Sequence, residues 1–531
     1  MLNLLLFSCA RVGAPNGGTR DSLAPKFLGS NIDTTRLNVS RTVKELRLDF
    51  DEYVMLKDFN KNFNVSPPIK KIKKVIPSNL ANKYVLIQWE DTLQANTTYN
   101  FNFGNAIVDN NESNPLPYFN FAFSTGDKID DLFVSGTVKD AMTLIKENQT
   151  AKDNKMVVGL YKAGENLDYK QKPDYITKVD EENYFELNFL PKGEFVIIAF
   201  DDENQNSVYD AGKEKVSFLK EKITLDSTSV RGLKLKLYPS KKVVKYKESK
   251  AINGGLLMTF EGNPETVDVK SLSEDLKDFK VTHAKRSDSV NIWFDAEKSN
   301  LGGNISKQVK LSYFTPTISD TISVSYKAVK DEFKLSNEAG NLIAPENNFV
   351  INTSLPIENL NTSSWKLESD SIAQDFTAKV SEKNPFKILV NSSFKPTKKY
   401  VLTIPKETVS SYYSSNDKSF QFQFEIDKPE NYGSFTAVIK NKPTAKFWVE
   451  LTNEKGEILY SQFTNASEVS FKNLKPATYI ARIRVDNNGN GFWDEADFAQ
   501  NIAAEDVYIF EKEINVRPLW EIKEDWELTN H

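Results

Sequence analysis

Aromatic and polar residues alternate in Tyr99-Asn-Phe101-Asn-Phe103, and again in Phe119-Asn-Phe121-Ala-Phe123. Successive side chains of a β-strand point to opposite faces, so this pattern places the aromatic rings on one buried face. Leu46-Arg-Leu48-Asp-Phe50 alternates in the same way, whereas helical periodicity is almost absent from the chain. Turn residues such as Asn114-Pro115 and Gly302-Gly303 separate the alternating segments. The sequence therefore predicts an all-β protein built from β-sandwiches in series.

The alternating segments recur along the chain. Residues 93–103 align with residues 394–404, and the same register carries residues 119–123 onto residues 420–424 without a gap. A second pair aligns residues 190–206 with the segment that starts at Leu474. The order A–B–middle–A′–B′ predicts that a two-domain unit was duplicated around an additional β module.

Several motifs in the first of these domains occur together in one family. They are Asp21-Ser-Leu-Ala-Pro25, Leu48-Asp-Phe50-Asp-Glu52, Leu93…Thr98-Tyr99, Asp109…Asn114 and Phe123-Ser-Thr125-Gly126. This combination resembles the bacterial Ig-like domain of the S-layer type (SbsA-like). The resemblance covers residues 21–127 and returns in weaker form over residues 335–428. It implies residues that build a fold, with no catalytic positions among them.

The B segments resemble transthyretin-like or carboxypeptidase-regulatory β-sandwiches. Val134-Ser-Gly136-Thr-Val138 opens like their first strand, and Phe185…Phe195 supplies a loop followed by a strand. This resemblance implies a fold and no particular function. The predicted organisation is a signal and tether at 1–20, an Ig-like domain at 21–128, a transthyretin-like sandwich at 129–240, a further sandwich at 241–334, a divergent second Ig-like domain at 335–429, and a second transthyretin-like sandwich at 430–531.

Cys9 is the single cysteine of the chain, and an apolar run ending in Leu6-Phe7-Ser8 precedes it. An aliphatic residue three positions before a cysteine and a small residue directly before it form the pattern of a bacterial lipobox. We therefore expect residues 1–8 to be removed and Cys9 to carry a lipid, with the Gly-rich residues 11–20 as a tether. The alternative is a cysteine buried in a first strand.

The whole chain also resembles Bacteroidota lipoproteins that carry an Ig-like domain near the N-terminus. This resemblance implies a lipid-anchored protein of the outer membrane. No acidic cluster follows Cys9. In such lipoproteins an acidic run marks surface export, so the periplasmic face is expected here.

Composition argues against several classes of function. Lys+Arg total 68 and Asp+Glu total 73, mixed along the chain without a basic stripe, so nucleic acid is not an expected partner. Only two histidines exist, His283 and His531. They cannot assemble a histidine metal cluster or support a Ser-His-Asp triad, and no Gly-rich phosphate loop follows a strand. The sequence predicts a protein without catalytic activity.

Two loops rich in Asp and Asn are the sharpest candidates for a ligand site. The second loop offers oxygen donors at the spacing of an EF-hand-like calcium loop, with Gly491 at the sixth position. Its predicted ligands are Asp486, Asn488, Asn490, the Phe492 carbonyl, Asp494 and Asp497. The first loop keeps Asp202, Asn204, Asn206 and Asp210, but has Lys213 at the twelfth position. Calcium is the predicted cofactor of both loops; the alternative is a turn that Asn, Asp and Gly favour by themselves.

Together these features predict a lipid-anchored envelope protein that binds or scaffolds a partner through stacked sandwiches. The partner is either an envelope protein or a glycan. A surface glycan-binding protein or adhesin is the alternative, in which Trp493, Trp520 and Trp526 form a stacking platform. These tryptophans otherwise pack the last sandwich or its neighbour.

Overall fold

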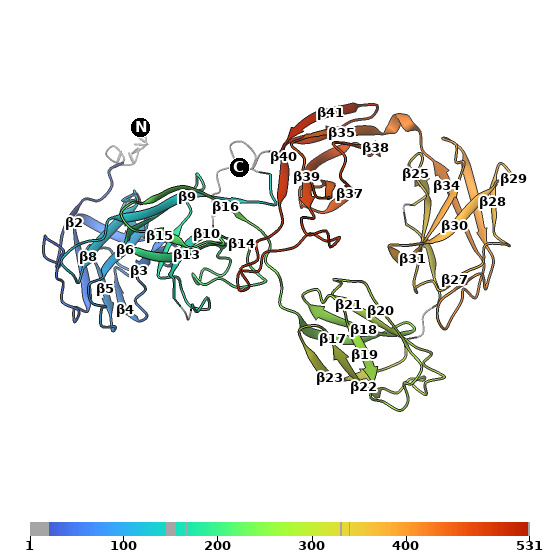
Figure 1. Cartoon of the computed structure of the whole chain (residues 1–531), viewed down its shortest axis with the longest axis horizontal. Helices are drawn as coiled ribbons and strands as arrows, with labels where there is room; N and C mark the ends of the chain where they lie inside the picture. The colour runs from blue at the N-terminus through green and yellow to red at the C-terminus, as the bar shows by residue number, and fades with distance from the viewer. Residues whose placement is uncertain (1–20, 145–154, 165–166, 330–331, 339, 529–531) are drawn as a thin grey trace, which may run out of the picture. The chain divides into compact units, whose positions relative to one another are not determined.

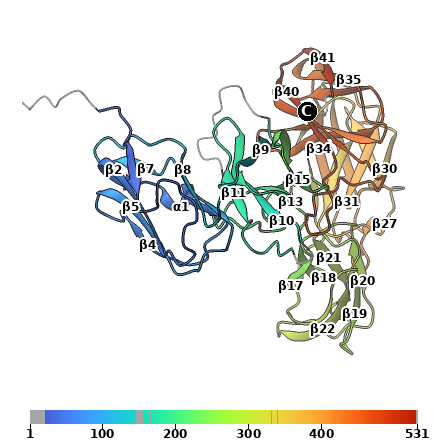
Figure 2. The same ribbon diagram turned by 60° about the vertical axis from the view of Figure 1, so that its left-hand side comes forward.

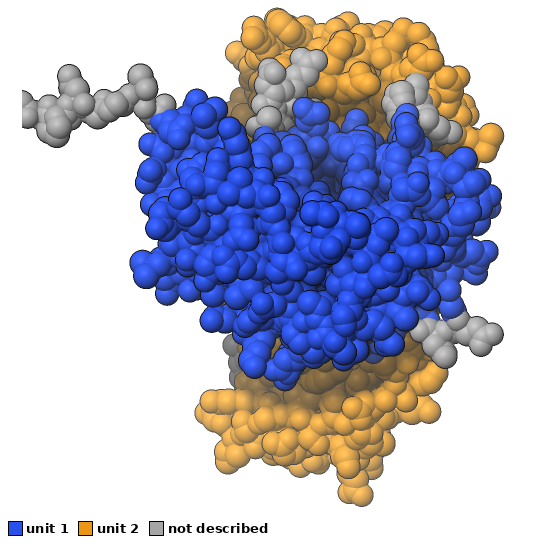
Figure 3. All heavy atoms as spheres, turned by 90° about the vertical axis from the view of Figure 1, so that its left-hand side faces the viewer, with its two compact units in different colours: residues 1–139, 148–210, 216–237 blue, residues 140–147, 211–215, 238–531 orange. Residues whose placement is uncertain are grey.

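The computed structural model describes residues 21–144, 155–164, 167–329, 332–338 and 340–528. Cys9 and the tether lie outside the described residues. Strands dominate the fold (Figure 1), which confirms the predicted series of β-sandwiches. The chain divides into two compact units, one formed by residues 1–139, 148–210 and 216–237 and the other by residues 140–147, 211–215 and 238–531 (Figure 3). No helix in the described ranges has the length and apolar character to span a membrane.

The first sandwich of the first unit has sheets ordered β1-β2-β5-β4, with β7 on β2, and β3-β6-β8. Its elements are β1 (Phe27–Ser30), β2 (Glu45–Leu56), α1 (Phe59–Asn62), β3 (Asn64–Ser66), β4 (Ile72–Ile76), β5 (Asn82–Trp89), β6 (Thr98–Gly104), β7 (Ile107–Asp109) and β8 (Phe119–Ser124). Phe101, Phe103, Phe121 and Phe123 are buried between the sheets, as the alternation predicts.

The second sandwich of this unit has sheets ordered β12-β9-β16 and β11-β10-β13-β14, with β15 on β13. Its strands are β9 (Leu132–Asp140), β10 (Met156–Lys162), β11 (Tyr175–Lys178), β12 (Tyr184–Leu190), β13 (Gly193–Asp201), β14 (Val216–Phe218), β15 (Ile223–Leu225) and β16 (Val230–Leu237). Figure 2 shows β11, β10 and β13 side by side.

The two sandwiches of the first unit pack directly on each other. Strand β3 of the first lies against β11 of the second, where the Ile176 N–H donates to Ser66 Oγ at 3.3 Å. The Thr98 hydroxyl donates to the Asp130 carboxylate at 2.9 Å beside them. As a result Tyr175, Ile176 and Thr177 of β11 are buried although β11 is an edge strand.

The second unit begins with a sandwich whose sheets are ordered β17-β18-β21-β20 and β19-β22-β23. Taken in chain order as A to G, these are the A-B-E-D and C-F-G sheets of a constant-type Ig sandwich. Its strands are β17 (Lys245–Ile252), β18 (Gly255–Glu261), β19 (Asp268–Ser271), β20 (Lys280–His283), β21 (Ser289–Trp293), β22 (Lys307–Phe314) and β23 (Ser319–Tyr326).

The next sandwich repeats the strand order of the first. Its sheets run β24-β26-β31-β30 and β25-β34-β32-β28-β29, with β27 paired to β33. The strands are β24 (Leu335–Asn337), β25 (Leu342–Ile343), β26 (Phe349–Thr353), β27 (Asn359–Leu360), β28 (Lys366–Ser369), β29 (Ile372–Ala373), β30 (Phe376–Ser381), β31 (Asn384–Ser392), β32 (Lys399–Ile404), β33 (Val409–Ser410) and β34 (Phe420–Ile426). The Tyr99 hydroxyl accepts the Gln94 N–H at 2.8 Å, and the Tyr400 hydroxyl accepts the Lys395 N–H at the same distance. This shared detail supports the duplication.

The C-terminal sandwich repeats the strand order of the second. After the 3₁₀ turn η1 (Pro429–Asn431), its sheets run β38-β35-β41 and β37-β36-β39-β40. The strands are β35 (Gly433–Lys440), β36 (Phe447–Thr452), β37 (Ile458–Thr464), β38 (Glu468–Leu474), β39 (Ala477–Val485), β40 (Val507–Val516) and β41 (Glu521–Glu527). Strand β37 therefore holds the place that β11 holds in the first unit.

In the described part of the chain, buried apolar side chains form five separate clusters that stabilise the fold. They span residues 32–123, 132–237, 256–326, 333–426 and 435–528, and Trp293 joins the fourth. Each sandwich thus has its own core, as expected where two sheets bury only their facing sides. The domain boundaries derived from the sequence stay a prediction.

Candidate functional site: the C-terminal loop and sheet face

The loop between β39 and β40 opens with a turn built around Asp486. The Asp486 carboxylate accepts the N–H of Asn490 and of Gly491, each at 3.0 Å. The Asn488 side-chain oxygen also accepts the Asn490 N–H at 3.0 Å. Gly489 and Gly491 have φ of +72° and +83°, a conformation that glycine adopts without steric cost. The sequence therefore folds into a compact turn whose side-chain oxygens point inward.

Asp494 is the centre of the side-chain contacts in this loop. Its Oδ2 accepts the amide of Asn488 at 2.5 Å and that of Asn490 at 2.7 Å. Its Oδ1 pairs with Arg286 at 2.7 Å, and the same guanidinium lies 4.6 Å from the centre of the Phe492 ring. Burial raises the pKa of Asp494, but the two amides and Arg286 outweigh it and hold the pKa below its ordinary value. Asp494 is therefore a stably ionised carboxylate.

Glu505 binds the backbone of this loop at two points. Its carboxylate accepts the N–H of Asn488 at 3.1 Å and of Asp494 at 2.9 Å, and its side chain is buried. Burial raises the pKa of Glu505, although the backbone N–H groups act in the opposite direction. The Trp493 indole donates to the Glu505 carbonyl at 3.1 Å. The spacing of the motif gave no signal for Glu505, because it lies beyond the twelve-residue loop.

The first Asp/Asn loop has the same internal hydrogen bonds. The Asp202 carboxylate accepts the N–H of Asn206 and Ser207 at 3.0 Å, and the Asn204 amide donates to Asp210 at 2.5 Å. Gln205 and Ser207 take the left-handed conformation that Gly489 and Gly491 have in the second loop. The repeated sequence therefore encodes a repeated turn.

The oxygen donors of the second loop indicate how well it could hold calcium. Asp486, Asn488 and Asn490 carry the oxygen donors that calcium prefers. Asp494, however, is already bound by two amides and by Arg286, and Asp497 accepts the Gln500 N–H at 3.2 Å outside this network. Within the described ranges, no group of three or more His, Cys, Asp or Glu side chains is arranged to hold a metal ion. The oxygen donors of this loop fit calcium in part. Calcium binding therefore stays a prediction.

A buried charge cluster lies on the sheet face next to this loop. Glu450 of β36 is fully buried and accepts Arg482 Nε at 2.6 Å and Arg484 Nε at 3.0 Å. These residues alternate with core residues along β36 and β39, a pattern typical of positions on the outer face of a sheet. Glu450 and Arg482 are buried nevertheless, while Arg484 is partly exposed, and the paired charges give this cluster a structural role.

Aromatic rings continue from the charge cluster across the same face. Trp448 stacks on Phe463 with ring centres 4.4 Å apart, and the Arg484 guanidinium lies 5.9 Å from the rings of Trp448 and Trp493. Trp493 is 6.4 Å from the ring of Tyr238. Burial raises the pKa of Tyr238 to about 12. We call Phe463, Trp448, Arg484, Trp493 and Tyr238 the aromatic row.

The tryptophans singled out from the sequence therefore have different surroundings. Trp526 is buried in the core of the C-terminal sandwich, as the packing alternative predicts. Trp493 belongs to the aromatic row, and Trp520 is 48% exposed. The stacking of Trp448 on Phe463 was not predicted, because the alternation of residues along one strand does not indicate which outward-facing ring contacts a ring of the next strand.

The segment that leads into the middle sandwich is held by the C-terminal loop. The Lys241 N–H donates to the Ala496 carbonyl at 2.8 Å, and the Ala496 N–H donates to the Pro239 carbonyl at 3.1 Å. The buried Ser240 hydroxyl accepts the Gly212 N–H at 2.9 Å and donates to the Glu214 carbonyl at 2.6 Å. Residues 239–241 therefore form part of the packed structure of the second unit.

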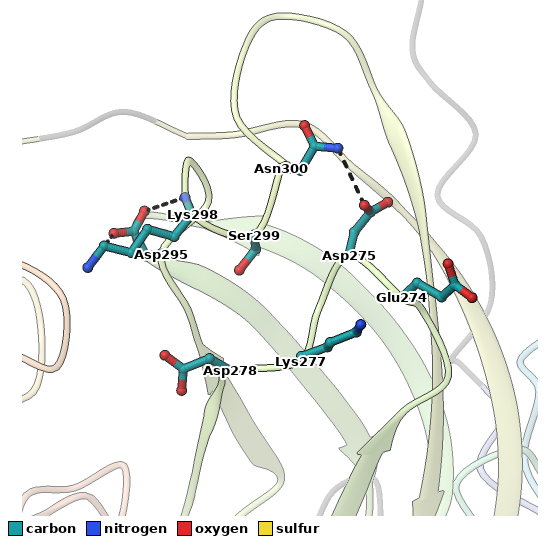
Figure 4. Close-up of a pocket in the computed structure, with 8 residues that line it drawn as sticks. All are labelled: Glu274, Asp275, Lys277, Asp278, Asp295, Lys298, Ser299 and Asn300. Carbon is teal, nitrogen blue, oxygen red and sulfur yellow. Dashed lines mark hydrogen bonds and ion pairs between the residues drawn. The ribbon is translucent and has the colours of Figure 1, made fainter.

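A separate surface pocket of about 270 Å³ lies in the middle sandwich (Figure 4). Its lining residues are Glu274, Asp275, Lys277, Asp278, Asp295, Lys298, Ser299 and Asn300. Asp295 is paired with Lys298 at 3.7 Å, and Asp275 accepts the Asn300 amide at 3.4 Å. Four acidic residues and two lysines line this pocket, and its lining has no histidine, cysteine or aromatic ring.

Comparison with known proteins supports the resemblance of the first domain to the bacterial Ig-like domain. Residues 21–125 match the family model of the bacterial Ig-like domain. The motifs noted in that segment, including Asp109 and the Phe123-Ser-Thr125 strand, lie inside the match. No curated protein matches the chain.

Three solved structures are similar over most of the chain. The S-layer protein SbsC is 11% identical, with a TM-score of 0.15, over 93% of this chain and 67% of its own. The glucan-utilisation protein SGBP-B of Bacteroides ovatus, solved with a mixed-linkage heptasaccharide, is 10% identical, with a TM-score of 0.21, over 74% of this chain and 97% of its own. The major pilin subunit BcpA of Bacillus cereus is 10% identical, with a TM-score of 0.14, over 75% and 99%. At such low identity and TM-score these likenesses transfer no function.

Proposed function

We propose that this protein is a non-catalytic scaffold of the bacterial cell envelope, anchored by lipid on Cys9. The observation that carries the proposal is that neighbouring sandwiches are joined by specific contacts. In the second unit, Trp293 of the middle sandwich packs on Phe386 with ring centres 6.1 Å apart, and the Asn473 amide donates to the Pro345 carbonyl at 2.8 Å. Such contacts suit a protein that presents a surface to a partner.

The location is tested by protease treatment of intact cells that produce the wild-type protein or Cys9→Ala. We expect the wild-type protein to fractionate with membranes and to resist protease until the outer membrane is broken. The unanchored variant should be released into the soluble fraction. Membrane retention of Cys9→Ala would contradict the lipid anchor.

A glycan-binding role at the cell surface is the second candidate. It is favoured by the stacked, partly exposed rings of Trp448 and Phe463, since flat aromatic faces can stack on apolar faces of a ligand. Digestion of the wild-type protein in intact cells would favour this candidate over a periplasmic scaffold.

We further propose that calcium binds the loop of Asp486, Asn488 and Asn490 and stiffens it. The variant Asn488→Asp separates this proposal from a turn that needs no ion. Without calcium, the new carboxylate loses the amide donated to Asp494 and repels it, so the melting temperature should fall. With calcium, an added negative ligand should raise affinity and restore the melting temperature.

The matched variant for this test is Asn204→Asp in the first loop, whose amide donates to Asp210 in the same way. Calorimetry with and without chelator measures both variants. A fall in melting temperature that calcium leaves unchanged at Asn488→Asp would show that the loop is a hydrogen-bonded turn only.

A further inference from the structure

Strand β37 is an exposed edge of the C-terminal sandwich. Within the described part of the chain it pairs with β36 alone, so its other edge presents backbone N–H and C=O groups without a strand partner. Its apolar side chains Ile458, Leu459 and Phe463 are 45%, 49% and 44% exposed. Exposed edges of this kind recruit further strands unless charges, prolines or covering segments protect them.

The composition of β37 offers little such protection. Its sequence ILYSQFT contains no charged residue and no proline, and a single bulge near Leu459 is its one irregularity. Among the described strands of five or more residues, β6, β8, β21 and β26 are also uncharged, but most of their residues are buried. Among these longer strands β37 alone combines an uncharged sequence and an edge position with mostly exposed side chains.

The duplicated architecture indicates how such an edge is used. Strand β11 holds the same place in the second sandwich, and there the neighbouring sandwich covers it through β3. Tyr175, Ile176 and Thr177 are buried as a result. The C-terminal copy keeps the edge strand and lengthens it to seven residues, but leaves it uncovered.

We propose that β37 pairs with β37 of a second copy of this chain, in antiparallel orientation about Ser461. This pairing places Phe463 of one copy opposite Leu459 of the other, and the two-fold axis generates this contact a second time. Both contacts remove these side chains from water. A strand without charges suits a two-fold axis, because any charge beside the axis would face its own copy. The two four-stranded sheets then continue as one.

The test uses the full chain carrying Cys9→Ala, so that neither lipid nor detergent affects association. Sedimentation equilibrium should give a reversible dimer for this protein. Ser461→Lys places two like charges at the axis, which should weaken dimerisation at least about tenfold. The control is Ser323→Lys, the same change at an exposed residue of β23, another edge strand of the unit. It should leave the dimer intact.

A cross-link keeps the result independent of folding defects in the lysine variant. Ser461→Cys should form a disulfide-linked dimer on mild oxidation, because opposed residues of antiparallel strands lie within disulfide reach. Ser323→Cys should form no disulfide-linked dimer under the same conditions, although it should still associate through β37. A monomer at all concentrations, or a dimer that survives Ser461→Lys, would overturn the proposal. A protein that stays monomeric would instead indicate that β37 pairs with a strand of another protein.

Discussion

Replacing Glu450 with alanine is expected to lower the free energy of unfolding of the C-terminal sandwich by about 3–5 kcal/mol. The carboxylate is fully buried and binds both Arg482 and Arg484, so its loss leaves the buried guanidinium of Arg482 and the partly buried one of Arg484 without their counter-charge. Denaturant unfolding followed by tryptophan fluorescence measures the change, since Trp448 and Trp526 lie in this sandwich.

The control for this experiment is Glu468→Ala in the same sandwich. Glu468 pairs with Lys523 at 3.3 Å, but both side chains are more than half exposed. Exposed pairs contribute about 0–1 kcal/mol, so this variant should unfold almost like the wild-type protein. Equal effects of the two substitutions would contradict a structural role for the buried cluster.

Replacing Asp109 with alanine is expected to destabilise the first sandwich by about 2–4 kcal/mol. The buried carboxylate accepts four backbone N–H groups, from Asn111 at 2.9 Å, Glu112 at 2.7 Å, Ser113 at 3.0 Å and Asn114 at 2.9 Å. Without it these donors lose a charged acceptor, and the turn between β7 and β8 loses its fixed shape.

The effect of Asp109 depends on pH in a defined direction. Burial raises the pKa of Asp109, but the four N–H groups outweigh it and hold the pKa below its ordinary value of 3.8. A carboxylate with a depressed pKa stabilises the fold fully above the pKa of the unfolded chain, and this contribution disappears as the pH falls through the folded pKa. The difference between wild type and Asp109→Ala should therefore be constant near neutral pH and shrink under acid conditions.

Asp33→Ala is the matched control, because Asp33 lies in the same sandwich and its carboxylate accepts the N–H of Thr35 at 2.8 Å from an exposed position. It should alter the unfolding curve little at any pH. A pH-independent difference for Asp109→Ala would indicate that the turn does not depend on the charge of this side chain.

Local patterns in the sequence predicted the strands well. The rings at Phe101 and Phe121 are buried on one face because alternation is a property of the strand itself. The repeats predicted that sandwiches would share a strand order, and the common hydrogen bond of Tyr99 and Tyr400 follows from that. The motif of Asp486, Asn488 and Asn490 likewise predicted a compact turn, because those side chains bond to backbone groups only a few residues away.

The contacts that define the candidate site could not be predicted in this way. Arg286 and Asp494 are far apart in the sequence and meet only because the second unit brings their loops together. Glu450 has the sequence context of an exposed residue, but it is buried where Arg482 and Arg484 of the neighbouring strand pair with it. Tertiary packing determines both, and alternation along one strand carries no information about it.

The hydrogen bonds between residues 239–241 and Ala496 have a consequence for how the chain matures. A polypeptide emerges N-terminus first, at roughly 5–20 residues per second during synthesis, so Lys241 is made roughly 13–50 s before Ala496. During that interval the backbone groups of Pro239 and Lys241 lack their partner Ala496, although Ser240 can already bond to Gly212 and Glu214. Completion of the C-terminal sandwich is thus the event that locks the start of the second unit, and truncation near the C-terminus would disturb a segment near the middle of the chain.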